Sequence, residues 1–476
     1  MTKRIYSALL VILMTVLVAV NGYHHQDAMA VLTDDDGIFQ KKDNLEIWYT
    51  DEALGDYLAR AALQYYQETG VRVVPTYVSG VRYLEQINQA EIDGTNAPDL
   101  YIVTNDMLEK AYLSGLAVPI KDERELVNEQ HFSKAALSAV TYQNKLLGYP
   151  LYFETSLFLY NETYLHDMAV ATIEAERNAA EGEAAQEMID SAESVEELDL
   201  TVSADAASDE PVSEEMILDK ELELVPVSMD RILTFAESYD APENVEAVFK
   251  WDVSDIFYNY FIVGDTINIG GENGDDFNQI DIYNQPAVDC LLKYQELNQF
   301  FSIDSASVSY DEVLQDFMDG KIVFTVATTD AINRLKQAKE KGEFQYDYAI
   351  TSIPQVSDEL SSRSLSVTNA LVINGYSAST DEANRFADYL IDGQEEDFYT
   401  LTDKIPAKND IQYENGAIYA ALDEYAISIP MPKMMRTSSF WAQLEIAFTK
   451  VWDGEDVDAT LLTLDQTVRE QIAKTE

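Results

Sequence analysis

The stretch that decides the fold reads Gly148-Tyr149-Pro150-Leu151-Tyr152-Phe153-Glu154-Thr155-Ser156-Leu157-Phe158-Leu159-Tyr160-Asn161. Its apolar run, Ser156–Tyr160, is typical of a buried strand and is bounded by Pro150 and Asn161. Glu154 is a lone carboxylate just before that run, and burying an unpaired charge is costly. Two interpretations follow: Glu154 is a solvated residue at a strand edge, or it faces a gap where the chain crosses between two lobes.

Strands and helices alternate in the hundred or so residues before this stretch. Apolar runs at Leu45–Tyr49, Val71–Val74 and Asp99–Val103 predict strands, with helical patterns between them. This order predicts parallel strands joined by right-handed crossovers, and ligands gather beyond the carboxyl ends of such strands. Asp51 and Asp106 follow two of these strands, so each is either a helix N-cap or a ligand-binding group.

Three later segments carry further candidates. The run from Lys250 to Val263 is rich in aromatic residues, which either form core or offer a ring face to a ligand; Tyr258 is the first candidate. The buried strand at Lys321–Val326 leads to a turn that ends at Asp330. Proline-rich chain and a small residue precede Phe440 and Trp441, which predicts a helix that begins there. Trp441 is therefore either a packed core residue or a stacking surface.

Composition limits the classes of function. The chain has 476 residues and a net charge of −55, from 31 basic and 86 acidic side chains. Such a charge repels phosphate backbones, so nucleic-acid binding is not expected. The 47% hydrophobic content is enough for a large core divided among two or three domains.

The N-terminus has the layout of an export signal. Lys3-Arg4 precedes the apolar run Ile5–Val20, and Ala28-Met29-Ala30 follows. The apolar run is shorter than the roughly 20 residues that span a bilayer comfortably. Residues 1–30 are thus a cleaved signal peptide or a retained membrane anchor, and the body is exported in either case. Cys290, the only cysteine, is expected to be an inert core residue.

Several motifs, in order, resemble extracellular solute-binding proteins of the maltose-binding type. They are Leu45–Trp48 in the opening strand, Pro98-Asp99-Leu100 before the third strand, Gly148-Tyr149-Pro150 with Glu154 and Tyr160-Asn161, Phe317 with Gly320-Lys321, Ile405-Pro406-Ala407, and Met431-Pro432 leading to Phe440-Trp441. Two departures stand out. Val103 and Asp330 occupy positions where the family has tryptophans.

The resemblance implies a two-lobe α/β fold of the periplasmic-binding-protein type. Each lobe is then a mainly parallel sheet flanked by helices, and three hinge crossings join the lobes, near 148–161, 348–354 and 405–407. Lobe 1 comprises residues 45–153 and 352–407, and lobe 2 comprises 154–351 and 408–476. The ligand-binding residues expected from the motifs and the local patterns are Trp48, Asp51, Glu52, Asp106, Tyr152, Glu154, Tyr258, Asp330 and Trp441.

An acidic segment at 169–224 interrupts the second lobe. Acidic residues far outnumber basic ones there, and no aromatic residue occurs from Leu165 to Thr234. Such a segment buries too little apolar surface to offset the entropy of ordering it. We expect a mostly disordered insertion, with a frayed helix near Ile173–Met188.

No catalytic motif occurs in the sequence. The histidines stand alone or near the signal segment, and the metalloprotease and nucleophile-elbow patterns are absent. The resemblance therefore implies a binding protein without enzymatic activity, cofactor or metal, which captures a sugar or oligosaccharide and delivers it to an ABC permease in the membrane. A polyamine or other cation also suits an acidic site. The alternatives are an extracellular carbohydrate-active enzyme and a ligand sensor of the same fold.

Overall fold

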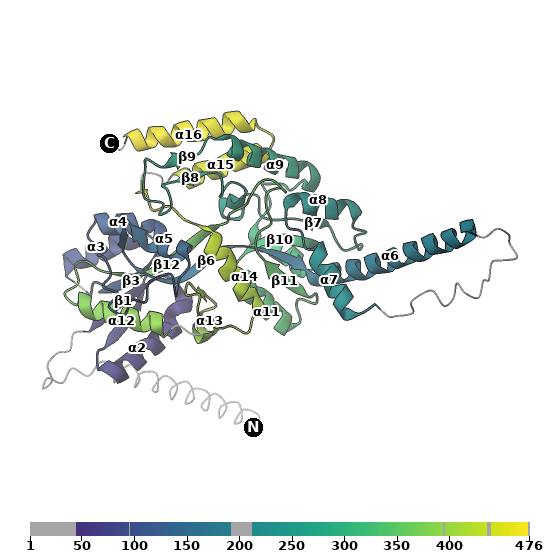
Figure 1. Cartoon of the computed structure of the whole chain (residues 1–476). Coiled ribbons are helices and arrows are strands. Elements are labelled where there is room, and N and C mark those ends of the chain that lie inside the picture. The colour runs from purple at the N-terminus through teal and green to yellow at the C-terminus, as the bar shows by residue number, and fades with distance from the viewer. Residues whose placement is uncertain (1–43, 95, 192–211, 394–395, 436–438, 475–476) are drawn as a thin grey trace, which may run out of the picture. The chain divides into compact units, whose positions relative to one another are not determined.

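One long strand, β6 (Tyr149–Asn161), occupies the stretch predicted to be a crossing. The computed structural model describes residues 44–94, 96–191, 212–393, 396–435 and 439–474. The first half of β6 pairs antiparallel with β12 (Leu365–Ile373), and the second half pairs antiparallel with β10 (Ile322–Thr328). A single strand thus belongs to both halves of the sheet (Figure 1).

The sheet runs in the order β2 (Val73–Tyr77), β1 (Leu45–Tyr49), β3 (Leu100–Thr104), β12, β6, β10 and β7 (Ala247–Phe249). The outer pairs are parallel: β1 with β2, β1 with β3, and β10 with β7. The central pairs, formed by β12 and β6, are antiparallel. Together with the many flanking helices, this sheet confirms the predicted α/β class.

The three segments predicted to cross between lobes lie side by side. β11 (Tyr348–Thr351) pairs with the second half of β6, and β13 (Ile405–Pro406) pairs with the first half. This arrangement suits a hinge made of neighbouring strands. Leu45–Glu476 form one compact unit, and the division of that unit into two lobes stays a prediction.

Helices cover the sheet on both faces (Figure 1). They include α2 (Gly55–Thr69), α3 (Tyr83–Asp93), α4 (Leu108–Leu113), α5 (Lys134–Val140), α8 (Met229–Ser238), α9 (Gln285–Phe301), α10 (Tyr310–Met318), α11 (Ala331–Lys341), α12 (Thr380–Asp392), α13 (Glu396–Thr402), α14 (Gly416–Ile427), α15 (Phe440–Trp452) and α16 (Val457–Lys474). Short elements complete the fold: η1 (Glu52–Leu54), η2 (Asn105–Met107), η5 (Ile256–Tyr258), η6 (Tyr260–Ile262), β4 (Thr141–Tyr142), β5 (Lys145–Leu146), β8 (Asn268–Ile269), β9 (Ile280–Asp281) and β14 (Ile429–Pro430).

Two large apolar clusters stabilise these layers. One joins α2, α12 and α14 to residues of β6, including Tyr152, Phe153 and Leu157. The other joins α9, α15 and α16 to β7 and β10, and the fully buried Cys290 belongs to it, as expected. α9 begins after its N-cap Asn284, whose side chain accepts a hydrogen bond from the Ala287 N–H.

α14 packs across the centre of β6 and also holds the chain between β11 and β12. The Glu424 carboxylate accepts a hydrogen bond from the Ile353 N–H at 3.1 Å and another from the Ser364 hydroxyl at 2.5 Å. Burial raises the pKa of Glu424, and these hydrogen bonds partly oppose that rise. One helix therefore contacts two of the three predicted crossings.

The prediction for the acidic segment 169–224 needs correction at its C-terminal end, whereas the helix expected near Ile173–Met188 is present. α6 (Glu162–Ser191) and α7 (Glu214–Leu224) are helices that pack together (Figure 1). Alanine and glutamate favour helix strongly, and Ala169 and Ile173 are buried at the start of α6. His166 Nδ1 lies 2.5 Å from a Glu221 carboxylate oxygen and ties the two helices. Residues 192–211 lie outside the described residues.

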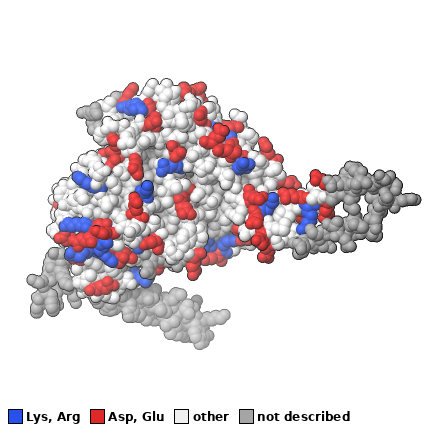
Figure 2. Space-filling view, viewed as in Figure 1, with Lys and Arg blue, Asp and Glu red and all other residues white. Residues whose placement is uncertain are grey.

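Charge is spread over the surface. Figure 2 shows acidic side chains across the viewed face, with basic ones between them. The predicted export signal at residues 1–30 lies outside the described residues. Within the described ranges, no helix combines the length and apolar character needed to cross a membrane.

Candidate functional site

Alternate side chains of β6 carry the centre of the site. Tyr152, Glu154 and Ser156 occupy every second position of the strand, so their side chains lie on the same face. The residues between them, Phe153 and Thr155, point to the opposite face. Glu154 is partly exposed, whereas Phe153 and Thr155 are buried on the opposite face.

A cluster of charged groups surrounds Tyr152 and Glu154. The Lys404 ammonium lies 3.1 Å from Glu154 Oε1 and 3.0 Å from Asp51 Oδ2. The same ammonium lies 5.6 Å from the centroid of the Tyr152 ring, and the Tyr152 hydroxyl donates to Asp51 Oδ2 at 3.3 Å. The cluster therefore joins the residue before η1, two residues of β6 and the residue before β13.

Local geometry fixes Asp51 in this cluster. It is the N-cap of η1, and its Oδ1 accepts a hydrogen bond from the Ala53 N–H at 3.0 Å. The helix-cap interpretation of Asp51 is therefore confirmed, while its role as a ligand-binding group stays a prediction. Lys404 directly precedes β13, and β13 pairs with β6 beside Phe153, which brings the lysine next to Glu154.

The electrostatics of the cluster hold Lys404 in its charged form. Burial alone would lower the pKa of Lys404, but the nearby Glu154 and Asp51 outweigh burial and raise it. Burial raises the pKa of the Tyr152 hydroxyl well above its usual value, and Asp51 and Glu154 raise it further. Tyr152 therefore remains a neutral donor at any physiological pH.

A second cluster lies around Tyr258, at the end of η5. Its ring stacks on that of Tyr310, with 4.8 Å between the centroids and 19° between the planes. The Tyr310 hydroxyl donates to Asp330 Oδ1 at 2.7 Å, and Thr328 also donates to Asp330. The Arg334 guanidinium lies 5.4 Å from the Tyr310 ring centroid and pairs with Asp330.

Ser156 of β6 connects the two clusters. Its hydroxyl donates to the Phe257 carbonyl at 3.0 Å, one residue before Tyr258. Its backbone lies opposite Thr328 in the β6–β10 ladder, two residues before Asp330. The fully buried Ser156 therefore links the strand that carries Glu154 to the second cluster.

The remaining predicted residues lie apart from these contacts. Glu52 is exposed in η1, and Asp106 lies in η2 at the carboxyl end of β3, where burial raises its pKa. Trp48 packs beside the cluster formed by α3, α4 and β3, and its indole Nε1 is buried without a hydrogen-bond partner among the described residues. In the part of the chain that the structure describes, none of these three side chains forms a hydrogen bond, ion pair or ring contact with Lys404 or Tyr258.

Trp441 lies in the first turn of α15, as the sequence predicts. Its ring packs edge-on against Tyr260, with 5.4 Å between the centroids, and against Phe440 at 5.1 Å. It is only partly buried, and α15 packs against η5, which carries Tyr258. Trp441 therefore neighbours the second cluster through helix packing, with part of its ring accessible.

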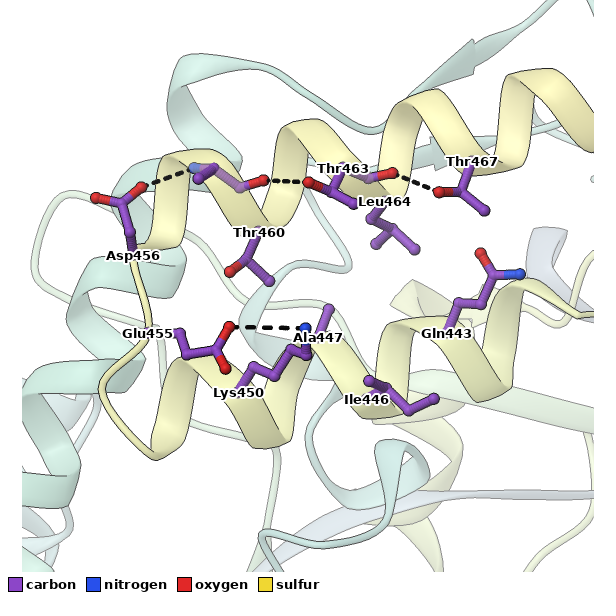
Figure 3. A pocket seen from close by; sticks show the side chains of 11 residues that line it. Gln443, Ile446, Ala447, Lys450, Glu455, Asp456, Thr460, Thr463, Leu464 and Thr467 are labelled. Atoms are coloured by element: carbon purple, nitrogen blue, oxygen red, sulfur yellow. Dashed lines mark hydrogen bonds and ion pairs between the residues drawn. The ribbon is translucent and has the colours of Figure 1, made fainter.

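A separate groove lies between α15 and α16 (Figure 3). It has a volume of about 330 Å³ and is lined by Ile446, Leu464 and several threonines, with an ion pair between Lys450 and Glu455. None of the predicted ligand-binding residues lines it. Among the residues that the structure describes, no group of three or more His, Cys, Asp or Glu side chains is placed to hold a metal ion.

Sequence reasoning missed three residues of these clusters: Lys404, Tyr310 and Arg334. Lys404 lies next to the Ile405-Pro406-Ala407 motif, so its proximity to a crossing was available as a signal. Tyr310 and Arg334 read as ordinary helix residues, and only the fold brings them to Asp330.

Comparison with known proteins agrees with this architecture. Residues 60–421 match the family model of bacterial extracellular solute-binding proteins. The maltodextrin-binding protein MdxE of Bacillus subtilis (strain 168) is 20% identical over 410 residues, which cover 83% of this chain and 82% of that protein.

Solved structures of similar fold are maltose- and maltodextrin-binding proteins. The extracellular solute-binding protein from Staphylococcus aureus, in complex with maltose, aligns with a TM-score of 0.68 at 18% identity, over 92% of this chain and 100% of that one. The maltose-binding periplasmic protein MalE from Listeria monocytogenes, in complex with maltose, gives 0.67 at 16% identity, over 92% and 100%.

The extent of the family match decides the classification. Because it spans well over half of the sequence, this chain belongs to the family of bacterial extracellular solute-binding proteins. The family and the matched relatives are binding proteins, not enzymes.

Proposed function

We propose that this protein is the substrate-binding component of an ABC uptake transporter and captures a maltooligosaccharide-like sugar. The observation that carries the proposal is that β6 holds Glu154 in contact with Lys404 and, through Ser156, contacts the segment that ends in the ring of Tyr258. The structures of similar fold that were solved in complex with maltose support this ligand class.

Each part of a sugar has a matching group in the clusters. Glu154 accepts hydrogen bonds from hydroxyl groups, and Lys404 donates to hydroxyl and ring oxygens. Tyr258 and Trp441 offer flat apolar faces to the C–H side of a sugar ring. The ligand-binding residues proposed from the sequence are retained as a set, with Lys404, Tyr310 and Arg334 added.

Binding would couple to motion about the three neighbouring strands β6, β11 and β13. Lobe 1, residues 45–153 and 352–407, closes on lobe 2, residues 154–351 and 408–476, in a hinge movement. Closure removes water from the site, so that a missing hydrogen bond costs more. The closed form is then the form that a membrane permease recognises on the outer side of the cell, whether the binding protein is free or anchored by its N-terminus.

Ligand-dependent stability tests the proposal. Purified protein is heated with maltose, maltotetraose, glucose or lactose, and the melting temperature Tm is followed. A ligand present at 100 times its Kd stabilises the folded state by about 2.7 kcal/mol, which raises Tm of a chain of this size by about 3 °C. Calorimetry on any sugar that shifts Tm then gives the affinity. No shift with any maltooligosaccharide, at concentrations up to the millimolar range, would refute the proposed ligand class.

A further inference from the structure

Lys404 occupies an unusual place for a cation in a site proposed to accept hydroxyl groups. Its ammonium lies between two carboxylates, Asp51 and Glu154, which come from separate elements of the chain. Only 22% of its side chain is exposed, so these two ion pairs fix its position. The inference drawn from it rests on the proposed function and concerns the ligands that the same site rejects.

The two carboxylates have different roles around Lys404. Asp51 uses both oxygens within the protein, because Oδ1 accepts from the Ala53 N–H and Oδ2 from Tyr152 and Lys404. Glu154 contacts Lys404 through Oε1, and 43% of its side chain is exposed. An ionised carboxylate has about four acceptor positions and an ammonium has three donors. Glu154 therefore keeps acceptor capacity for a ligand, and Lys404 keeps one N–H.

The second cluster repeats this compensation of charge. Asp330, a potential partner of a cationic ligand, pairs with Arg334 at 3.4 Å. Arg334 also donates to Asp311 at 2.8 Å and lies over the Tyr310 ring. A polyamine that entered the site would thus meet an ammonium at one end and a guanidinium at the other, in spite of the acidic surroundings.

We propose that Lys404 is a specificity-determining residue: paired with Asp51 and Glu154, it donates to a neutral, hydroxyl-rich ligand and excludes polyamines from the same subsite. Removal of its charge would leave two adjacent uncompensated carboxylates, which attract cations and repel each other. A single lysine thereby makes the site select sugars over polyamines, the two ligand classes that the acidic sequence alone leaves open.

The test uses the full chain and two probes, maltotetraose and spermidine, in calorimetric titrations. Lys404→Met removes the charge, Lys404→Arg keeps it, and Lys341→Met removes an equal charge from an exposed position at the end of α11. We expect Lys404→Met to bind maltotetraose about tenfold more weakly and to gain spermidine binding. Lys404→Arg and Lys341→Met should keep the wild-type preference.

Three outcomes overturn the inference: unchanged maltotetraose affinity in Lys404→Met, spermidine binding by the wild type as tight as that of maltotetraose, or no gain of spermidine binding in Lys404→Met. The spermidine titration of the wild type needs no variant. It can therefore still overturn the inference if Lys404→Met does not fold, which circular dichroism would reveal. If the wild type binds no maltooligosaccharide, the proposed function fails instead, and the gain or absence of spermidine binding in Lys404→Met still decides the role of the lysine.

Discussion

The rings of Phe153 and Tyr425 lie face to face, with 3.9 Å between their centroids and 5° between their planes. Both side chains are 1% exposed. Phe153 is the residue of β6 next to Glu154, so its side chain points to the opposite face of the strand. The stack therefore fixes α14 behind the strand whose other face carries the candidate site.

Phe153→Ala should lower the free energy of unfolding by about 3–5 kcal/mol, because it removes a fully buried ring and leaves a cavity beneath Tyr425. Urea unfolding followed by circular dichroism measures this change. The matched control is Phe300→Ala in α9, where the ring is 52% exposed; it should cost about 1 kcal/mol or less. Equal losses in the two variants would show that the stack is not the source of the effect.

Lys433 makes stability depend on pH. Its side chain is 1% exposed, and Nζ donates to the carbonyls of Ser138 at 2.8 Å and Asn273 at 2.5 Å. Burial lowers the pKa of Lys433 from its usual 10.5 to about 7, with partial opposition from Asp275. Between these two values the unfolded chain binds more protons than the folded chain, so the contribution of Lys433 to stability increases as pH rises.

The comparison that isolates this effect is the wild type against Lys433→Met. The difference between their free energies of unfolding should grow in favour of the wild type from about pH 7 toward pH 10. Urea titrations at several pH values measure it, and Lys450→Met, which removes a half-exposed lysine of α15, controls for loss of a charge. A difference that stays constant with pH would contradict the expectation.

Trp441→Ala should weaken binding of maltotetraose by about 30-fold, the loss of about 2 kcal/mol typical of an aromatic hot spot. The fold should survive, because the ring is only partly buried at the first turn of α15. Calorimetry measures the affinity. The control is Tyr283→Ala, which removes an exposed tyrosine that donates a hydrogen bond to Asp458. Wild-type affinity in Trp441→Ala would remove this residue from the site.

Replacement of residues 180–212 by a short Gly-Ser linker should leave maltotetraose affinity unchanged within about twofold. The side chains at 178–183 are exposed and the last buried residue described in α6 is Ile173, so the described start of the replaced segment contributes little packing. Calorimetry on the shortened protein measures this, with Tm as the check on folding. A large loss of affinity would assign the acidic segment a part in ligand capture.

Local patterns predicted much of the fold. Apolar runs and their boundaries located β1, β3, β6 and β10, because a buried strand must be apolar whatever it pairs with. In the acidic segment the helix expected near Ile173–Met188 is part of α6, but composition was misleading at α7, where helix propensity outweighs the low content of large apolar residues.

The site was harder to predict, since its contacts join distant residues. Glu154 and Lys404 are 250 positions apart, and no local pattern pairs them. The sequence indicates only that Tyr310 lies in a helix. Its hydrogen bond with Asp330 depends on where α10 packs. Asp51 shows the opposite case: cap chemistry is local, so the sequence alone indicated that its side chain would be oriented.

The single cysteine has a practical consequence. Cys290 is fully buried in α9, and burial raises the pKa of its thiol to about 11, so almost none of it is the reactive thiolate at neutral pH. Thiol-specific dyes should therefore spare the native chain. A pair of cysteines introduced on opposite sides of β6 would then accept a fluorescent donor and acceptor cleanly, and the protein could serve as an optical sensor of its own ligand.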